Sequence, residues 1–175
     1  MTGLAFHDIH VIQGEQAVSD AADATMQTVL GSCVSACLHD PVRGIGGMNH
    51  FLLPDSGGAT DIRYASAAME QLVNALLKRG AARERLQAKL FGGARIMPNL
   101  PDIGRRNGEA ALAFLSNEGI ACKSHSLGGA QARRIRFWPA TGRAQQLLID
   151  RQDAVQNAEI ARERPRCASG SIELF

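Results

Sequence analysis

The chain has 175 residues, of which 45% are hydrophobic and 21% are charged, and this composition excludes a generally disordered protein. Nineteen Lys and Arg residues against 17 Asp and Glu residues leave a net charge of +2, too small to favour a nucleic-acid or membrane surface. The length fits one domain over residues 1–175, and the apolar runs are too short for a membrane helix. Because residues 1–4 also lack a basic, apolar secretion signal, we expect a cytoplasmic protein with free thiols.

The first predicted elements are two buried segments that flank a tight turn. Residues 28–38 are small, β-branched and apolar, and they lead into the turn signal Asp40-Pro41. A second apolar, strand-like run follows over residues 45–54, where a pair of glycines permits close approach of the backbone. This arrangement can return a side chain of the second segment to the first.

The rest of the chain mixes helices with strands. Apolar residues at helical spacing predict a helix that includes residues 69–77 and ends at Gly80. The later predicted elements are a strand over residues 86–91, a helix over 107–117, a strand over 120–127, a hairpin with strands 134–138 and 144–149, and a surface helix or mobile tail over 151–175 that ends in the apolar run 172–175. The pattern therefore indicates mixed α and β content, with a second half that is mostly sheet.

Cys33 and His50 are the residues best suited to catalysis. A cysteine is a strong nucleophile only as a thiolate, and a nearby imidazole or several backbone amides favour that form. Cys33 follows Gly31 and Ser32, and the glycine lets the backbone bend so that amide groups can point at an oxyanion beside the sulfur. Ser32 is a weaker nucleophile than its neighbour and is expected to supply a supporting contact.

Two other interpretations fit the same residues. Cysteine is among the most buried residue types, so Cys33 can be a core residue whose neighbouring glycine only allows close packing. Cys33 and Cys37, followed by His39 and His50, also form a loose set of zinc ligands, although cysteine-rich metal sites usually bring their ligands in closely spaced pairs. We expect no metal, but a cysteine with a distant histidine does not establish catalysis without geometry.

Several short sequence motifs are more specific than Cys33 and His50 alone. The first half contains Leu-Gly-Ser-Cys-Val at residues 30–34, Asp-Pro at 40–41, Gly-Gly at 46–47, and His50 followed by Leu-Pro at 53–54. The strings Lys-Leu-Phe-Gly-Gly-Ala at 89–94, Ile-Gly-Arg-Arg-Asn at 103–107, Leu-Gly-Gly at 127–129 and Ile-Glu-Leu-Phe at 172–175 follow in order. Together they resemble the chemoreceptor glutamine deamidase family, CheD, over nearly the whole chain, and so many ordered matches are hard to produce by chance.

This resemblance implies roles for the site residues. By it, Cys33 is the nucleophile and His50 the general base, with Gly31 and Ser32 in support. A threonine a few residues before the cysteine completes the family site. Thr28 is the best match, and the position of Gln27 is the alternative register.

The resemblance also implies the fold and the reaction. The expected fold is an α+β layered domain in which helices pack outside a mixed β-sheet sandwich, as in a class of toxin deamidases. The expected reaction converts glutamine side chains of methyl-accepting chemotaxis receptors to glutamate through a Cys thioester, with glutamyl methyl esters as a second substrate and no cofactor. Family members also bind the phosphatase CheC, which makes CheC a possible partner here.

Other functions stay open at the level of sequence. A cysteine amidase or peptidase with the same two residues would cleave backbone amides or small molecules, and a non-enzymatic adaptor would only bind receptors or CheC. The chain departs from the family at Ala132, where a further glycine is usual. Next to it, Arg133, Arg134 and Arg136 offer either a positive edge to an acidic receptor helix or an ordinary solvated face.

Overall fold

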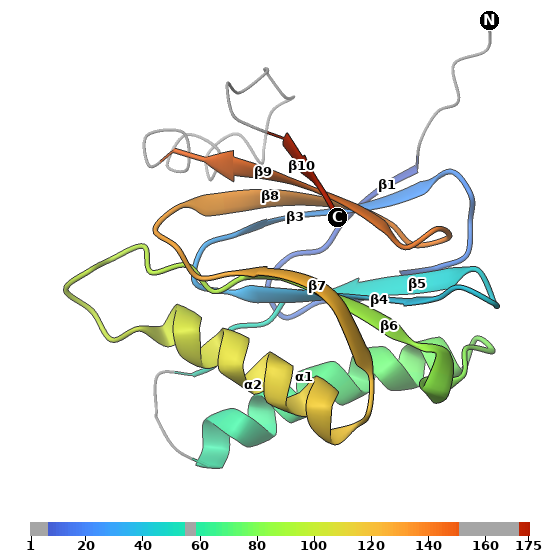
Figure 1. The fold of residues 1–175 in the computed structure, drawn as a ribbon, viewed down its shortest axis with the longest axis horizontal. Coiled ribbons are helices and arrows are strands. Elements are labelled where there is room, and N and C mark those ends of the chain that lie inside the picture. The colour runs from blue at the N-terminus through green and yellow to red at the C-terminus, as the bar shows by residue number, and fades with distance from the viewer. Residues whose placement is uncertain (1–6, 55–58, 151–171) are drawn as a thin grey trace, which may run out of the picture.

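The computed structural model describes residues 7–54, 59–150 and 172–175, and these form three layers (Figure 1). The elements are β1 (His7–His10), β2 (Gln16–Ser19), β3 (Ala24–Leu30), β4 (Val34–Asp40), β5 (Ile45–Asn49), α1 (Ala59–Leu77), the 3₁₀ turn η1 (Arg83–Arg85), β6 (Gln87–Gly92), α2 (Ile103–Asn117), β7 (Ala121–Leu127), β8 (Ala132–Trp138), β9 (Arg143–Ile149) and β10 (Ile172–Leu174). Sheet A has the strand order β1-β3-β8-β9-β10, and sheet B has the order β2-β5-β4-β6-β7.

The two sheets lie face to face, and both helices cover the face of sheet B that is turned away from sheet A (Figure 1). Each sheet is mixed, because β1 pairs with β3 and β6 pairs with β7 in parallel while the other pairs are antiparallel. The expected α+β arrangement, a mixed β-sandwich with flanking helices, is therefore confirmed. Among the described residues, no helix combines the length and the apolar character needed to cross a bilayer.

Alternation along β4 divides the core into two clusters. Val34, Ala36 and Leu38 point to the helix layer and pack with apolar residues of α1 and α2. Cys37 points the other way, into a cluster between the two sheets that also contains Met26 and Phe91. Alternate side chains of β4 pack against different layers, so the strand is buried along its whole length.

The first helix agrees with its sequence pattern. Met69, Leu72 and Leu76 are fully buried against sheet B, as their helical spacing requires. The helix is followed by Gly80, whose φ of 93° lies in the left-handed region that only glycine adopts without strain. The helix itself ends at Leu77, three residues before the predicted end, and a turn leads from it to Gly80.

The second helix begins earlier than the sequence pattern predicts. It starts at Ile103 rather than at Asn107, because the Asp102 side chain accepts a hydrogen bond of 3.0 Å from the backbone N–H of Arg105 and caps the first turn. Gly104 lies inside this turn, and a Cβ there would overlap the backbone carbonyl of Ala94. The glycine that argues against helix in isolation thus permits close helix–sheet packing.

The end of the chain returns to the sandwich. Residues 151–171, where a surface helix or mobile tail was predicted, lie outside the described residues. Beyond them, β10 pairs antiparallel with β9 at the edge of sheet A. The Phe175 ring meets the Phe91 ring edge-on, with ring centroids 5.4 Å apart. The apolar C-terminal run is therefore an edge strand with an aromatic anchor.

Candidate active site

The connection that carries Cys33 crosses from one sheet to the other. It leaves β3 of sheet A and enters β4 of sheet B, with only Gly31, Ser32 and Cys33 between the two strands. A Cβ at Gly92 would overlap the carbonyl of Cys33, and Gly92 has a φ of 112°. Gly92 therefore permits close approach of β6 to this connection, whereas a Cβ at Gly93 would overlap the carbonyl of Gly104 in α2.

Three carbonyl groups hold the connection in place. The Gly31 oxygen accepts from the Ala94 N–H at 2.9 Å, and the Cys33 oxygen accepts from the Gly93 N–H at 2.8 Å. The Ser32 oxygen accepts from Nδ2 of Asn107 at 2.7 Å. Hydrogen bonds to the carbonyls of Cys33 and of the two residues before it thus fix the backbone of the nucleophile candidate before any substrate binds.

Asn107 also ties this connection to the segment that follows His50. Its Oδ1 accepts from the Leu53 N–H at 2.8 Å, and the residue is completely buried in α2. One side chain therefore bridges both segments of the site. The sequence contained a signal for it, since Asn107 ends one of the ordered motifs, but that motif suggested no role.

His50 lies on the same face of sheet B as Cys33. The backbones of Val34 and Phe51 exchange two hydrogen bonds of 2.9 Å, which makes these two residues direct partners across the strands. The same register places Ser35 opposite His50, and Cys33 two residues from Ser35 on the same side. Cys33 and His50 are therefore diagonal neighbours on the face that is turned to sheet A.

Thr28 reaches His50 from the opposite sheet. It faces inward from β3, and its Oγ1 lies 2.8 Å from Nδ1 of His50. Oγ1 also donates its proton to the carbonyl of Val11 at 2.7 Å. Since a hydroxyl has one proton, Oγ1 is left to accept from His50, so the proton of the neutral imidazole resides on Nδ1.

The other imidazole nitrogen is left free. Nε2 of His50 is buried and makes no hydrogen bond within the described part of the chain. Burial lowers the pKa of His50, and the Val11 carbonyl offsets this only in part, so the ring is neutral at neutral pH. Its free lone pair is on Nε2, as a general base requires.

Cys33 remains a protonated thiol in this resting arrangement. Burial raises the pKa of Cys33, and its own backbone N–H opposes the effect. The Sγ–H donates to Oε1 of Gln13 at 3.6 Å rather than to the histidine. The structure therefore joins Thr28 to His50 directly and brings Cys33 to the same face, with a glutamine that the sequence did not indicate at the sulfur.

The other candidates have structural roles or none. Cys37 is completely buried, and burial raises its pKa to about 12, so it stays a thiol. Nδ1 of His39 pairs with the Pro139 carbonyl at 2.9 Å. Arg133 is neither a positive edge nor a solvated side chain, because it is buried and donates to Ser126 and to the Gly128 carbonyl. Cys167 lies outside the described residues. Within the described ranges, no three His, Cys, Asp or Glu side chains gather as metal ligands would.

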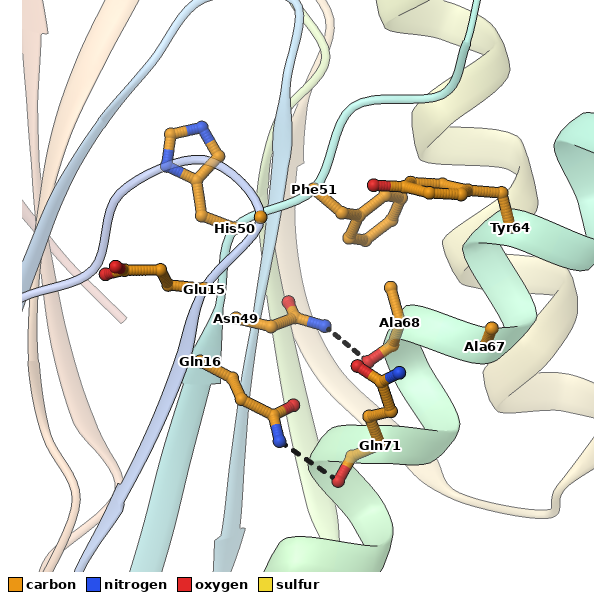
Figure 2. A pocket seen from close by; sticks show the side chains of 10 residues that line it. Glu15, Gln16, Asn49, His50, Phe51, Tyr64, Ala67, Ala68 and Gln71 are labelled. Carbon is orange, nitrogen blue, oxygen red and sulfur yellow. Dashed lines mark hydrogen bonds between the residues drawn. The ribbon is translucent and has the colours of Figure 1, made fainter.

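A pocket borders the base on the helix side of β5. Figure 2 shows the His50 ring turned away from Asn49, whose amide donates to the Ala68 carbonyl of α1 at 3.3 Å. The pocket is lined by Gly14, Glu15, Gln16, Asn49, His50, Phe51, Tyr64, Ala67, Ala68 and Gln71. His50 belongs to the lining of this pocket, and Cys33 does not.

Comparison with known proteins decides the family. Residues 52–147 match the family described as CheD chemotactic sensory transduction. A protein of a Caulobacter species is 52% identical over 177 residues, covering 95% of this chain and 92% of its own length. The chain belongs to the CheD family. The matched segment begins after His50, so it is the full-length relatives that carry the likeness across both Cys33 and His50.

The curated CheD relatives carry one name, "Probable chemoreceptor glutamine deamidase CheD". Among them, a Cereibacter sphaeroides protein is 51% identical over 95% of this chain and 84% of its own length. An Agrobacterium fabrum protein is 52% identical over 95% of this chain and 96% of its own. Solved structures are more remote. The crystal structure of Bacillus licheniformis hypothetical protein YfiH is 14% identical, with a TM-score of 0.44 over 64% of this chain and 50% of that one.

Proposed function

We propose that this CheD-family chain is a cysteine hydrolase that deamidates glutamine side chains of chemoreceptors. The curated relatives are named for that activity. The observation that carries the proposal is the buried Nε2 of His50, which has no hydrogen-bond partner in the described part of the chain. Thr28 sets the tautomer of this ring, which lies on the same face as Cys33. Catalysis at such a site needs a nucleophile, a base and a group that orients the base.

The chemistry follows from these positions. Nε2 of His50 takes the Sγ proton, and the thiolate of Cys33 attacks the carboxamide carbon of the substrate glutamine. The tetrahedral intermediate collapses as His50 returns the proton to the departing ammonia, and a thioester remains. Water activated by His50 then hydrolyses the thioester, which gives glutamate and restores the thiol. A glutamyl methyl ester can enter the same sequence with methanol as the leaving group.

The proposed substrate is the cytoplasmic helical bundle of a methyl-accepting receptor, which places the reaction in the cytoplasm. The phosphatase CheC is a further proposed partner. Two alternatives differ in their products: a peptidase would cleave the receptor chain, and an adaptor would bind the receptor without changing it.

The test is mass spectrometry of a purified receptor fragment after incubation with the protein. Each deamidated glutamine adds about one dalton with no chain cleavage, as expected for exchange of an amide for an acid. We expect Cys33→Ala to abolish the change and Cys122→Ala, at an exposed free cysteine, to preserve it. Cleavage of the fragment would indicate a peptidase. A receptor that binds with unchanged mass would indicate an adaptor and overturn the proposal.

A further inference from the structure

Gln13 lies in the connection between β1 and β2, and this connection is tied to the site on both sides. Val11 donates its N–H to the Gln27 carbonyl at 2.9 Å, and its own carbonyl accepts the Thr28 hydroxyl at 2.7 Å. Gly14 donates its N–H to the His50 carbonyl at 2.8 Å. The backbone on each side of Gln13 is therefore fixed by bonds to the residues that form the site.

The side chain of Gln13 uses that position to contact the reacting atom. Its Oε1 accepts from Sγ of Cys33 at 3.6 Å, while the rest of the side chain is exposed. A carboxamide carries two N–H donors on the nitrogen beside this oxygen. The Gln13 carboxamide can therefore accept a hydrogen bond from a thiol through Oε1, or donate one to an anion through Nε2–H.

We propose that Gln13 is a further catalytic residue, whose side-chain amide donates a hydrogen bond to the oxyanion that forms when Cys33 attacks the substrate carboxamide. This inference rests on the proposed deamidase function. Once His50 has taken the Sγ proton, the sulfur no longer donates, and Oε1 loses its partner. Rotation about the terminal torsion of Gln13, which has a broad two-fold profile, then turns Nε2–H toward the developing negative charge.

The backbone N–H of Cys33 is the second donor of this oxyanion site. This N–H favours the thiolate, because it lowers the pKa of Cys33 against the effect of burial. No proton leaves Gln13 during the reaction, so Gln13 is unchanged after each turnover. Its contribution is a donor that turns toward the oxygen as the negative charge develops.

The experiment compares Gln13→Met, which keeps the side-chain length but has no N–H donor, with wild type on the receptor fragment. Removing one oxyanion donor is expected to lower kcat about 100-fold and to change KM little. Gln13→Glu, which has the same shape but a negative charge in place of the amide, is expected to lose at least as much activity. Gln131→Met is the control, because Gln131 is also exposed but donates to Asp150.

Labelling of Cys33 by iodoacetamide gives a readout that does not depend on deamidation. Loss of a donor beside the sulfur in Gln13→Met should raise the pH midpoint of labelling by about half to one unit. If wild type fails to deamidate the receptor, the proposed function fails while this shift still tests the placement of Gln13.

Three results would overturn the role of Gln13. The first is unchanged kcat together with an unchanged labelling midpoint in Gln13→Met. The second is a raised kcat, which would make Gln13 a gate that occupies the place of the substrate. The third is a Cys33-dependent gain of about one dalton at Gln13 in isolated wild type, which would make Gln13 itself a substrate.

Discussion

Strand β4 begins beside Cys33 and ends at Asp40. The polar groups at its two ends differ in how far their hydrogen bonds are satisfied. The Asp40 carboxylate is fully buried and accepts from the Arg85 guanidinium at 2.7 Å and from the Ala82 N–H at 2.9 Å. It also accepts from the N–H groups of Val42 and Arg43 in the turn that follows. These bonds outweigh burial and hold the pKa of Asp40 well below its usual range.

At the other end, the base is left without a partner. Nε2 of His50 is buried and makes no hydrogen bond to any residue that the structure describes. Burial shifts the pKa of His50 downward and that of Cys33 upward, so both groups stay neutral at rest. A buried polar group without a partner costs folding free energy of about 1–3 kcal/mol. The comparison suggests that the Asp40 end contributes stability and the Cys33 end contributes reactivity.

The strongest test of this contrast removes the free nitrogen. His50→Gln keeps a polar side chain of similar reach but has no general base, so we expect deamidation to fall about 10²- to 10⁴-fold, the usual contribution of general acid–base catalysis. Iodoacetamide labelling of Cys33 should slow as well, because burial favours its thiol once the imidazole is gone.

The wild-type protein supplies the internal comparison for this labelling. Cys33 should react faster than Cys37, whose thiol is kept inert by burial. Equal labelling of all cysteines in wild type would contradict an activated Cys33.

Deamidation activity should also persist somewhat below pH 6.5, because burial lowers the pKa of His50 and keeps the ring neutral there.

Asp40→Asn tests the opposite end of the strand. It removes the charge that binds Arg85 while preserving the shape, and we expect the free energy of unfolding to fall by about 2–3 kcal/mol, the scale of hydrogen bonds to charged groups. Activity of the folded fraction should stay unchanged. Urea unfolding with a parallel deamidation assay makes the check, and a loss of kcat in fully folded protein would show that the two ends are coupled.

The pH dependence of stability follows from the same carboxylate. Because the pKa of Asp40 is lower in the folded protein than in the unfolded chain, its contribution is complete above the ordinary carboxyl value of 3.8. It is lost as the pH falls below that value toward the folded pKa. The Asp40→Asn variant should therefore show a shallower loss of stability in acid than wild type.

The sequence predicted the site residues that lie in contiguous motifs, but not the contacts that depend on the fold. Cys33 and His50 could be proposed from the sequence as nucleophile and base because both stand in contiguous motifs. Gln27 or Thr28 could not be decided there, since both lie near the cysteine. The structure separates them by strand parity: Thr28 faces His50, whereas Gln27 contacts Asp8 on the neighbouring strand.

Contacts that depend on tertiary packing were out of reach. Gln13 stands in a short connection without periodicity, and only the fixed backbone of Val11 and Gly14 brings it to the sulfur. The start of α2 was missed because Gly104 disfavours helix locally, although in the fold it permits close packing on Ala94. In both cases long-range geometry decides the residue's role.

The smallest effect is expected at Thr28, whose hydroxyl orients the base without touching the substrate. Thr28→Val removes the acceptor for the Nδ1 proton, but the Val11 carbonyl lies 3.3 Å from Nδ1 and can accept it instead. We therefore expect kcat to fall about tenfold, equivalent to roughly 1.4 kcal/mol, with Thr28→Ser close to wild type. Nitrogen NMR of the imidazole should show the proton still on Nδ1 in the serine variant and a mixture of tautomers in the valine variant. A loss as large as that of His50→Gln would mean that the Val11 carbonyl cannot replace the hydroxyl, and the tautomer would then depend on Thr28 alone.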